Sequence, residues 1–299
     1  MQLRFLKTFT AVANTLNFTR AAEQVHLAQS SVTEQIQALE AELGVKLFDR
    51  SRRKLKLTAA GQRLLGYAAE LSNLADEAYS SVASTSADIS GSLVIGGLET
   101  LCATWLPEVV AEFSRRYPAV ELTLKTTDSG GLRNGIKHGD LDVSFFFGDG
   151  WAEKGLRSEA VTEEELLVIL PSNHRLAGRE AIKPAELADE VFLVTPPGCV
   201  YRKMFDETFA ATLPALPKIA GEFASIGSIR GLVEAGVGCA LVPRSALAVQ
   251  PARVVVVPWL GTARATSVTM MWRHRRVDRP ETNAFLAIAR ELLRNQTRR

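Results

Sequence analysis

Residues 19–57 read TRAAEQVHLAQSSVTEQIQALEAELGVKLFDRSRRKLKL, and this stretch decides the fold of the N-terminal part of the chain. Thr19 is a good N-cap residue, so it predicts a helix over residues 20–25. Three residues then separate this helix from a second one, predicted to begin at Gln29. The second helix carries apolar side chains on a single face, namely Val32, Ile36, Leu39 and Leu43. Two helices around so short a turn indicate a helix-turn-helix, a motif that places its second helix in the DNA major groove.

A basic hairpin follows the second helix. Gly44 offers a left-handed stop for that helix, and residues 45–48 and 55–57 are expected to form two short strands. Between them lies the cation-rich segment Asp49-Arg50-Ser51-Arg52-Arg53-Lys54. Such a wing can lie along phosphates or insert an arginine into a minor groove. A charged run standing alone would be read as a solvated turn, but its place after the two helices favours a winged helix-turn-helix.

Charge and side-chain chemistry in this region both fit DNA. Residues 1–58 contain nine basic and five acidic residues, a net charge of +4, whereas the whole chain carries +2. The positive potential is therefore concentrated at the N-terminus. The first turn of the second helix presents short polar side chains where an inserted helix meets base edges and phosphates: Gln29, Ser30, Ser31 and Thr33. A preceding helix with Leu3, Leu6, Phe9 and Ala13 on one face is expected to cover the back of the motif.

Composition bounds the remaining function classes. A chain of 299 residues with 46% hydrophobic and 23% charged residues is expected to fold into two or three globular units. Its three cysteines are far apart and form no CxxC pair, so neither a disulfide framework nor a zinc site is expected. The sequence has no GxSxG or HExxH motif, which leaves an enzymatic activity, a catalytic residue, a metal or a cofactor unsupported. A short, interrupted apolar patch near the N-terminus does not fit an export signal, and no apolar run approaches a membrane span. We therefore expect a cytoplasmic protein.

A long helix is expected after the wing, from a cap at Thr58 to about Ser84. Its apolar residues alternate by four and three, which is the spacing of a heptad seam: Leu64, Ala68, Leu71, Ala75, Ala78 and Val82. A narrow seam with charged flanks needs a partner helix. The simplest partner is the same helix of a second copy, and packing within one chain is the alternative. The polar residues 84–91 indicate a linker to a new domain.

The rest of the chain alternates between strand and helix patterns and is predicted to be α/β. Strands are expected at 92–96, 120–124 and 143–147, with helices at 100–116 and 132–138, giving a parallel sheet flanked by helices. A second subdomain is expected from the strand at 166–170 to that at 254–257. The chain then returns through a strand at 268–272 and a helix at 281–294. Two such subdomains create a cleft in which ligands favour the carboxyl ends of the strands.

Residues at strand ends and helix starts are the candidates to face that cleft. They are Thr100, Leu101, Cys102, Thr127, Ser129, Phe147, Thr195, Gly198, Cys199 and Ile226. Thr100 and Ser129 are the foremost, although plain helix capping explains them equally well. Free backbone N–H groups there could receive an anion, while Asp128 would oppose one, so the ligand's charge stays open. Cys102 near a helix start and Cys199 on the opposite lip admit a redox sensor, with buried core cysteines as the stronger alternative. Cys239 is expected in the core.

The N-terminal motifs resemble those of LysR-type transcriptional regulators. The resemblance rests on Phe18-Thr19-Arg20-Ala21-Ala22, Gln29-Ser30-Ser31-Val32-Thr33, Gln35-Ile36, Leu39-Glu40, Leu43-Gly44, Leu47-Phe48-Asp49-Arg50 and Leu57-Thr58-Ala59-Ala60-Gly61. Looser similarity covers the remainder of the chain. The resemblance implies DNA contacts from Gln29, Ser30, Ser31 and Thr33, with Thr19 and Arg20 near phosphates and Arg52 or Arg53 from the wing. It implies double-stranded operator DNA of dyad symmetry, a small-molecule effector, a second copy of the chain (as homodimer or homotetramer) and RNA polymerase as partners.

The implied fold is an α+β multidomain chain. A winged helix-turn-helix domain (1–58) is followed by a linker or dimerisation helix with its hinge (59–90) and an effector-binding domain (91–299) like the type 2 periplasmic binding proteins. Subdomain I spans about 91–162 and 267–299, and subdomain II about 163–266. One departure from the family pattern is Glu34, an acid where a basic or neutral residue is usual. Its carboxylate repels phosphates but can accept a hydrogen bond from cytosine N4. The alternative function is a two-lobed solute-binding module or enzyme without operator binding.

Overall fold

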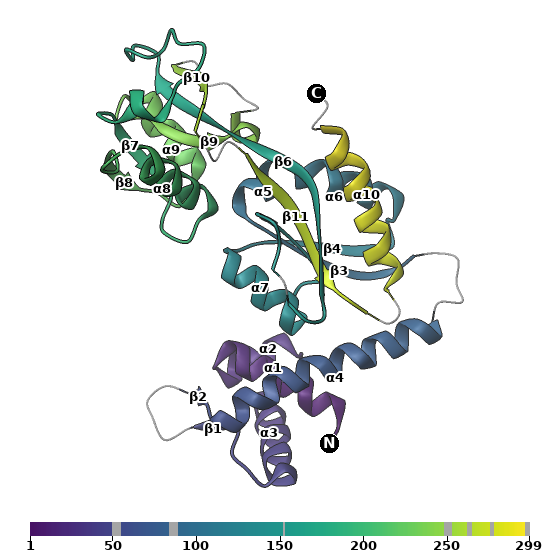
Figure 1. Cartoon of the computed structure of the whole chain (residues 1–299). Coiled ribbons are helices and arrows are strands. Elements are labelled where there is room, and N and C mark those ends of the chain that lie inside the picture. The colour runs from purple at the N-terminus through teal and green to yellow at the C-terminus, as the bar shows by residue number, and fades with distance from the viewer. Residues whose placement is uncertain are drawn as a thin grey trace. The chain divides into compact units, whose positions relative to one another are not determined.

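The computed structural model describes residues 1–49, 55–83, 89–151, 153–247, 253–261, 265–275 and 278–296. It divides into two compact units, the first built on residues 1–88 and the second on 89–133, 141–274 and 280–299 (Figure 1). The first unit contains the following helices and strands: α1 (Leu3–Thr15), α2 (Phe18–Gln24), α3 (Gln29–Leu43), β1 (Phe48–Asp49), β2 (Lys56–Leu57) and α4 (Ala59–Ala83).

The first unit is held together by one apolar cluster that the helical periodicity predicted. Leu6 and Phe9 of α1 are buried against Val32, Ile36 and Leu39 of α3. The ring of Phe9 lies 5.5 Å from that of Phe48, so the cluster also includes the first strand of the wing. The apolar face of α3 points inward, and most of its polar side chains are exposed or half-buried, with Glu40 as an exception. Gly44 ends α3 at φ 68°, the left-handed conformation expected from the sequence.

The prediction that Thr19 caps α2 is wrong, because the helix begins one residue before it. The N-cap is Asn17, whose side-chain oxygen accepts hydrogen bonds from the backbone N–H groups of Thr19 at 2.9 Å and Arg20 at 3.1 Å. These are two of the donors that a helix leaves unpaired in its first turn. Thr19 therefore stands inside the helix with an exposed side chain.

Alanine substitutions can test whether Asn17 or Thr19 caps α2. Asn17→Ala should destabilise the first turn of α2 by about 1 kcal/mol, whereas Thr19→Ala should cost no more than about 0.5 kcal/mol. Amide hydrogen exchange of residues 18–24 in the full-length protein measures this locally, and we expect about fivefold faster exchange in the Asn17 variant only. A larger effect at Thr19 would contradict the assignment of the cap.

The described parts of the two wing strands are shorter than the sequence suggests, with Phe48 paired to Leu57 and Asp49 to Lys56. Residues 50–54, with Arg52 and Arg53, lie outside the described residues. The long helix α4 begins as predicted, because the Thr58 hydroxyl accepts the N–H of Gly61 at 3.0 Å. A Cβ at Gly61 would lie 2.2 Å from the Leu47 carbonyl oxygen, so this close approach of α4 to the wing requires glycine.

The second unit is organised around a mixed sheet, in which the three strands predicted to be parallel are joined by antiparallel ones. Its strands are β3 (Gly91–Gly97), β4 (Val120–Thr126), β5 (Val143–Phe147), β6 (Leu156–Pro171), β9 (Ala240–Pro243), β10 (Val254–Pro258) and β11 (Ala265–Arg273). Their order is β10-β6-β11-β5-β3-β4, with β9 also paired to β6. Strands β3, β4 and β5 are parallel, whereas β11 is antiparallel to both β5 and β6. A separate parallel pair joins β7 (Val191–Val194) to β8 (Lys218–Glu222).

Strand β6 is the element that connects the two halves of this unit. It starts at Leu156, ten residues before the strand predicted from Leu166, and runs through both halves (Figure 1). Its first part pairs with β11, and its last part pairs with β9 and β10. The pairing with β11 shifts register between Val268 and Thr269, and such an irregularity bends a sheet locally.

Helices flank these strands. They are α5 (Glu99–Thr104), α6 (Leu106–Arg116), α7 (Ser129–His138), η1 (Pro184–Leu187), α8 (Val200–Thr212), α9 (Ile226–Glu234), η2 (Arg244–Leu247) and α10 (Pro280–Gln296). The single helix predicted over 100–116 is in fact α5 and α6, divided at Trp105. Pro107, in the first turn of α6, explains the division, because proline has no N–H to continue a preceding helix.

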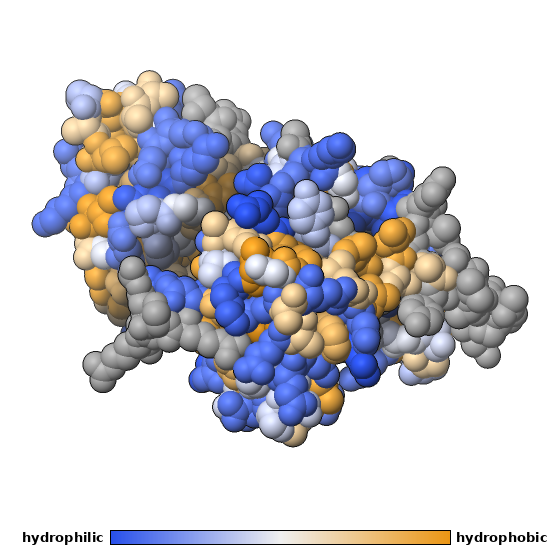
Figure 2. Space-filling view, turned by 90° about the horizontal axis from the view of Figure 1, so that it is seen from below, coloured by the Kyte–Doolittle hydropathy of each residue, from blue (hydrophilic) through white to orange (hydrophobic). Residues whose placement is uncertain are grey.

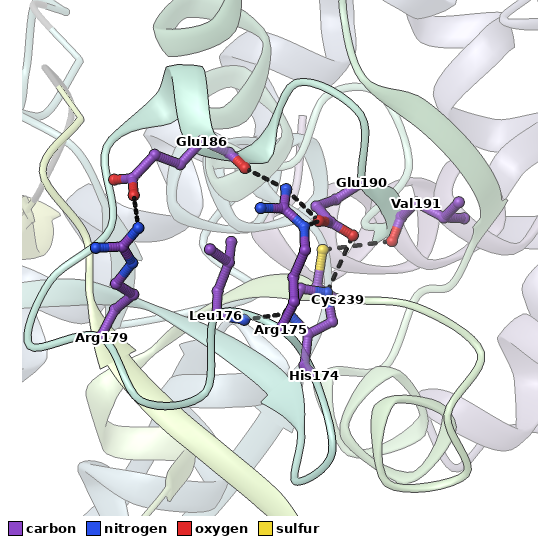
Figure 3. Close-up of polar contacts among 8 residues, drawn as sticks. All are labelled: His174, Arg175, Leu176, Arg179, Glu186, Glu190, Val191 and Cys239. Atoms are coloured by element: carbon purple, nitrogen blue, oxygen red, sulfur yellow. Dashed lines mark hydrogen bonds and ion pairs between the residues drawn. The ribbon is translucent and has the colours of Figure 1, made fainter.

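A polar cluster fixes the connection between β6 and β7. Figure 3 shows Glu190 accepting from Arg175 Nε at 2.7 Å and lying 3.0 Å from Nε2 of His174. In the same view the Cys239 thiol donates to the Val191 carbonyl at 3.4 Å. Cys239 is 1% exposed and belongs to an apolar cluster with Phe192 and Phe205, as its sequence context predicted.

Candidate functional site

The first turn of α3 presents the polar surface expected of a recognition helix. Gln29, Ser30 and Glu34 are exposed, while Ser31 and Thr33 are half-buried. The Thr33 hydroxyl donates to the Gln29 carbonyl at 3.0 Å, which leaves its oxygen free to accept. Ala28 stands at the N-cap, so no side chain caps this helix end. Uncapped N–H groups at a helix start suit a phosphate oxygen, and the exposed Thr19 and Arg20 lie on the first turn of the neighbouring α2.

A buried carboxylate that the sequence analysis missed joins α3 to the wing. Glu40 is 3% exposed and accepts the backbone N–H groups of Leu47 at 2.9 Å and Phe48 at 3.3 Å, as well as Lys46 Nζ at 2.9 Å. Burial alone would raise the pKa of this carboxyl group. The hydrogen bonds from Lys46 and from the two backbone amides outweigh burial and hold its pKa below the ordinary value of 4.5.

Removing this carboxylate should destabilise the first unit. Glu40→Ala leaves two buried N–H groups without acceptors and should lower the free energy of unfolding by about 2–3 kcal/mol at pH 7. The control is Glu42→Ala on the same helix, because Glu42 is more exposed and, among the described residues, pairs with the terminal amino group. Its loss should cost less than about 1 kcal/mol. Urea unfolding of the full-length variants gives both values.

The pH dependence has a definite sign. Because the pKa of Glu40 is lowered on folding, its contribution is complete above pH 4.5 and is lost as the pH falls through the folded-state pKa. The difference in stability between the parent and Glu40→Gln should therefore shrink on acidification below pH 4.5. A difference that stays constant or grows would show that the carboxylate is not what fixes the wing.

Helix α4 carries a different exposed stripe from the predicted seam. Ala68 is 0% exposed, and Leu64 and Leu71 pack against the apolar cluster of the first unit. That part of the seam is therefore covered by its own domain. Tyr67 and Leu74 are 64% and 60% exposed. Of the other seam residues, Ala75 is half-buried and Ala78 exposed, and the side chain of Val82 lies outside the described side chains. Figure 2 shows the molecule from below, with hydrophobic residues exposed among hydrophilic ones on this face.

The second unit contains a cavity of about 600 Å³ where the parallel strands end. Its walls come from the residues that follow β3, β4, β5, β7 and β8, together with the first turns of α5, α7, α8 and α9. This is the position at which open α/β sheets bind ligands, because strand ends and helix N-termini converge there.

Most of the predicted cleft residues line this cavity. They are Thr100, Thr127, Ser129, Phe147, Thr195, Gly198, Cys199 and Ile226. Two do not line it: Leu101 is fully buried in the main apolar cluster, and Cys102 lies against Gly97 and the Lys125 carbonyl. Tyr201 lines the cavity although it was not predicted. The sequence did contain a signal for Tyr201, because it lies at the start of a helix directly after the predicted cleft segment Thr195–Cys199.

Burial dominates the electrostatics of this wall. The Tyr201 side chain is 4% exposed, and burial, followed by the charge of Glu164, raises its pKa well above the usual value. Burial likewise raises the pKa of the Cys102 thiol, which disfavours the thiolate that a redox sensor at this position would need. Thr195 is 5% exposed, and its hydroxyl has no hydrogen-bond partner among the described residues.

Glu164 lies close to this wall in the middle of β6. It is 1% exposed and accepts Nε1–H of Trp105 at 2.6 Å and the N–H of Ser245 at 3.0 Å. Burial raises the pKa of its carboxyl group. The side chain of Glu164 thus links three elements from different parts of the sequence: the boundary between α5 and α6, strand β6, and η2. Nothing in the local sequence marked it as buried.

In the described part of the chain, no group of three or more histidine, cysteine or acidic side chains is arranged to hold a metal ion. Among the described helices, none is long and apolar enough to cross a membrane.

Family models match both units of the chain. Residues 3–62 match the bacterial regulatory helix-turn-helix protein, lysR family, and residues 86–294 match the LysR substrate binding domain. The chain is 38% identical over 242 residues to the transcriptional regulator YofA of Bacillus velezensis, covering 81% of both proteins. It is 31% identical over 279 residues to the transcriptional regulator BudR of Raoultella terrigena, covering 91% of this chain and 95% of BudR.

Solved structures of full length share the fold. A full-length OxyR variant from Pseudomonas aeruginosa superposes with a TM-score of 0.80 at 22% identity, covering 98% of this chain and 95% of that one. Full-length CbnR in complex with its target DNA superposes with a TM-score of 0.65 at 25% identity, covering 97% and 99%. The chain belongs to the LysR family of DNA-binding transcriptional regulators, with an N-terminal helix-turn-helix domain and a C-terminal effector-binding domain.

Proposed function

We propose that two copies of this chain bind a dyad operator, each placing the first turn of α3 in a major groove. The observation that carries the proposal is the exposed polar turn at Gln29 and Ser30, supported from behind by the buried apolar face of the same helix. Gln29, Ser30, Ser31, Thr33 and Glu34 would meet base edges or phosphates. Thr19 and Arg20 would meet the backbone, and Arg52 and Arg53, outside the described residues, would act from the wing.

We further propose that the dimer forms along α4. The stripe made by Tyr67, Leu71, Leu74 and Ala78 has the four-three-four spacing of a helix pair. Tyr67 and Leu74 stay exposed within the single chain, and a second copy of α4 would cover them. Leu71, which lies between them in the stripe, also packs against the cluster of its own unit. Dimers would pair into tetramers through the second unit. This stripe replaces the seam through Leu64 and Ala68, which the first unit already buries.

The cavity is the proposed effector site. The eight predicted residues that line it, with Tyr201, would contact the small molecule. A ligand seated on Tyr201 would lie close to Glu164, which joins the middle of β6 to Trp105, between α5 and α6, and to Ser245 of η2. Ligand binding would thereby bias the angle between the two halves of the unit and the arrangement of dimers on DNA.

The remaining assignments follow from this scheme. Residues 1–58 would read DNA, 59–90 would pair and space the copies, and 91–299 would bind effector, with subdomain I at about 91–162 and 267–299 and subdomain II at about 163–266. The protein would work in the cytoplasm, where the chromosome lies, and RNA polymerase would be a further partner.

A mobility-shift assay tests the proposal. Full-length protein is titrated against the DNA upstream of its own gene and against a shuffled fragment of equal length, at about 50 mM and 200 mM salt. We expect a discrete complex with the upstream fragment that survives the higher salt and competition by the shuffled fragment. Equal retardation of both fragments would contradict operator recognition.

A further inference from the structure

The cavity wall contains two carboxylates and no basic side chain. Glu99 opens α5, and Asp128 precedes α7. Asp128 accepts the N–H of Gly131 at 2.7 Å through Oδ1, which leaves its second oxygen free, and Glu99 forms no ion pair with any described residue. The nearby cation Arg202 donates to the Thr195 carbonyl at 3.3 Å, but it is already paired with Asp206 at 3.0 Å and Glu222 at 2.6 Å. The net side-chain charge of the residues that line the cavity is therefore negative, and both acidic residues are exposed to solvent.

An apolar, aromatic surface lies beside these carboxylates. Phe147 and Tyr201 are buried with their ring centroids 5.0 Å apart and tilted by 51°. Leu98, Val200 and Ile226 complete this surface. Ring faces attract organic cations, and acidic side chains next to aromatic rings are a common way to recognise them. The buried, unpartnered hydroxyl of Thr195 supplies an acceptor for an N–H donor on the same wall.

The side of the cavity formed by the starts of α8 and α9 has two features that could bind an anionic group. Cys199 and Ser225 stand at the N-caps of α8 and α9, and neither side chain caps its helix. Their first-turn N–H groups could receive a carboxylate. A ligand bearing only a carboxylate would be repelled by Glu99 and Asp128 across the cavity. A ligand that also carries an ammonium group could place its carboxylate at the helix starts and its ammonium group near the two acidic residues.

We propose that the cavity binds an organic ammonium compound with an apolar, preferably aromatic, body. Glu99 and Asp128 meet the positively charged nitrogen, and Phe147 and Tyr201 pack against the body. This proposal rests on the cavity being the effector site. It resolves the ligand charge that the sequence alone left open.

Matched probes test the ligand class on the full-length protein by calorimetry and thermal shift. The probes are amines, carboxylates and amino acids that share the same phenyl, indole or cyclohexyl body, represented by 2-phenylethylamine, 3-phenylpropionate and phenylalanine. We expect the amines to bind at least about tenfold more tightly than the matched carboxylates. If amino acids bind more tightly than the amines, the N–H groups at the starts of α8 and α9 also contact the ligand through its carboxylate. If amino acids bind more weakly than the amines, those N–H groups do not contribute to binding. Either result keeps the ammonium group as the feature recognised.

Charge-neutral variants locate the effect. Glu99→Gln with Asp128→Asn should weaken amine binding about tenfold and reduce the preference over carboxylates, while the asparagine still caps α7. Glu121→Gln, which removes an exposed charge from β4 away from the cavity, should leave the preference unchanged. Carboxylates binding as tightly as amines, an unaltered preference in the double variant, or no binding by any amine would overturn the proposal. Operator binding is measured on the same samples to separate the two proposals. If the ligand proposal fails but the parent protein still binds the operator, the regulator function is retained. If the parent protein does not bind the operator, the proposed function itself fails.

Discussion

Replacing Gln29 by alanine is expected to weaken operator binding by about 10- to 100-fold while leaving binding to unrelated DNA unchanged. Gln29 is the first residue of α3, and its side chain is exposed. A glutamine amide can donate and accept at one base edge, and a well-placed contact of this kind discriminates by about 1–3 kcal/mol. Alanine is a good helix former and removes no buried contact, so the fold should be unaffected.

Fluorescence anisotropy with labelled operator and with shuffled DNA separates this loss of specificity from a general loss of affinity. The control is Gln2→Ala, which removes an exposed glutamine that makes no capping hydrogen bond on α1. It should bind both DNAs like the parent. If Gln29→Ala weakens both DNAs equally, Gln29 acts on the phosphate backbone and the base-reading assignment fails.

The second large effect is expected from a charge in the α4 stripe. Leu74→Glu should convert the dimer to a monomer, because two copies of the new carboxylate would be buried next to each other. Operator binding should then fall by about 100-fold or more, since each half-site loses the advantage of being linked to the other. The fold of the single chain should persist because Leu74 is 60% exposed within it.

Light scattering after gel filtration measures the mass of each variant directly. Leu216→Glu is the matched control, because it places the same charge at another exposed leucine, 43% exposed, in the second unit. It should remain dimeric and bind the operator. A dimeric Leu74→Glu protein with undiminished operator affinity would show that the copies pair elsewhere.

Local signals predicted much of the fold because they are set by adjacent residues. The left-handed stop at Gly44 and the cap at Thr58 meet local backbone requirements that only a few residue types satisfy. The cavity was predictable for a similar reason. Residues that follow parallel strands lie at the carboxyl ends of those strands, which brings Thr100 and Ser129 together at one edge of the main sheet. Thr195 lines the same cavity from the end of β7, in the separate strand pair.

Features that depend on tertiary packing were not predictable. Asn17 and Thr19 can both cap a helix, and the left-handed turn at Leu16 determines that the chain enters α2 through Asn17. The faces of α4 that contain Ala68 and Leu74 both look like seams, and only the packing of the first unit shows which one is already covered.

Buried carboxylates were missed for the same reason. Glu40 and Glu164 look like surface acids in the sequence, because their partners, the amides of Leu47 and Phe48 in one case and Trp105 with Ser245 in the other, are brought to them only by the fold. Burial of a charged group is tolerated where hydrogen bonds compensate for lost hydration, and that compensation cannot be seen in a local pattern.

Hydroxyl-radical footprinting of full-length protein on its upstream DNA tests the central claim most directly. Two copies of α3 in successive major grooves predict protected patches related by a two-fold axis, with centres one or more whole helical turns apart, about 10 base pairs each. Gln29→Ala should lose both patches together. A single patch, protection without two-fold symmetry, or symmetric protection that persists unchanged in Gln29→Ala would contradict the account.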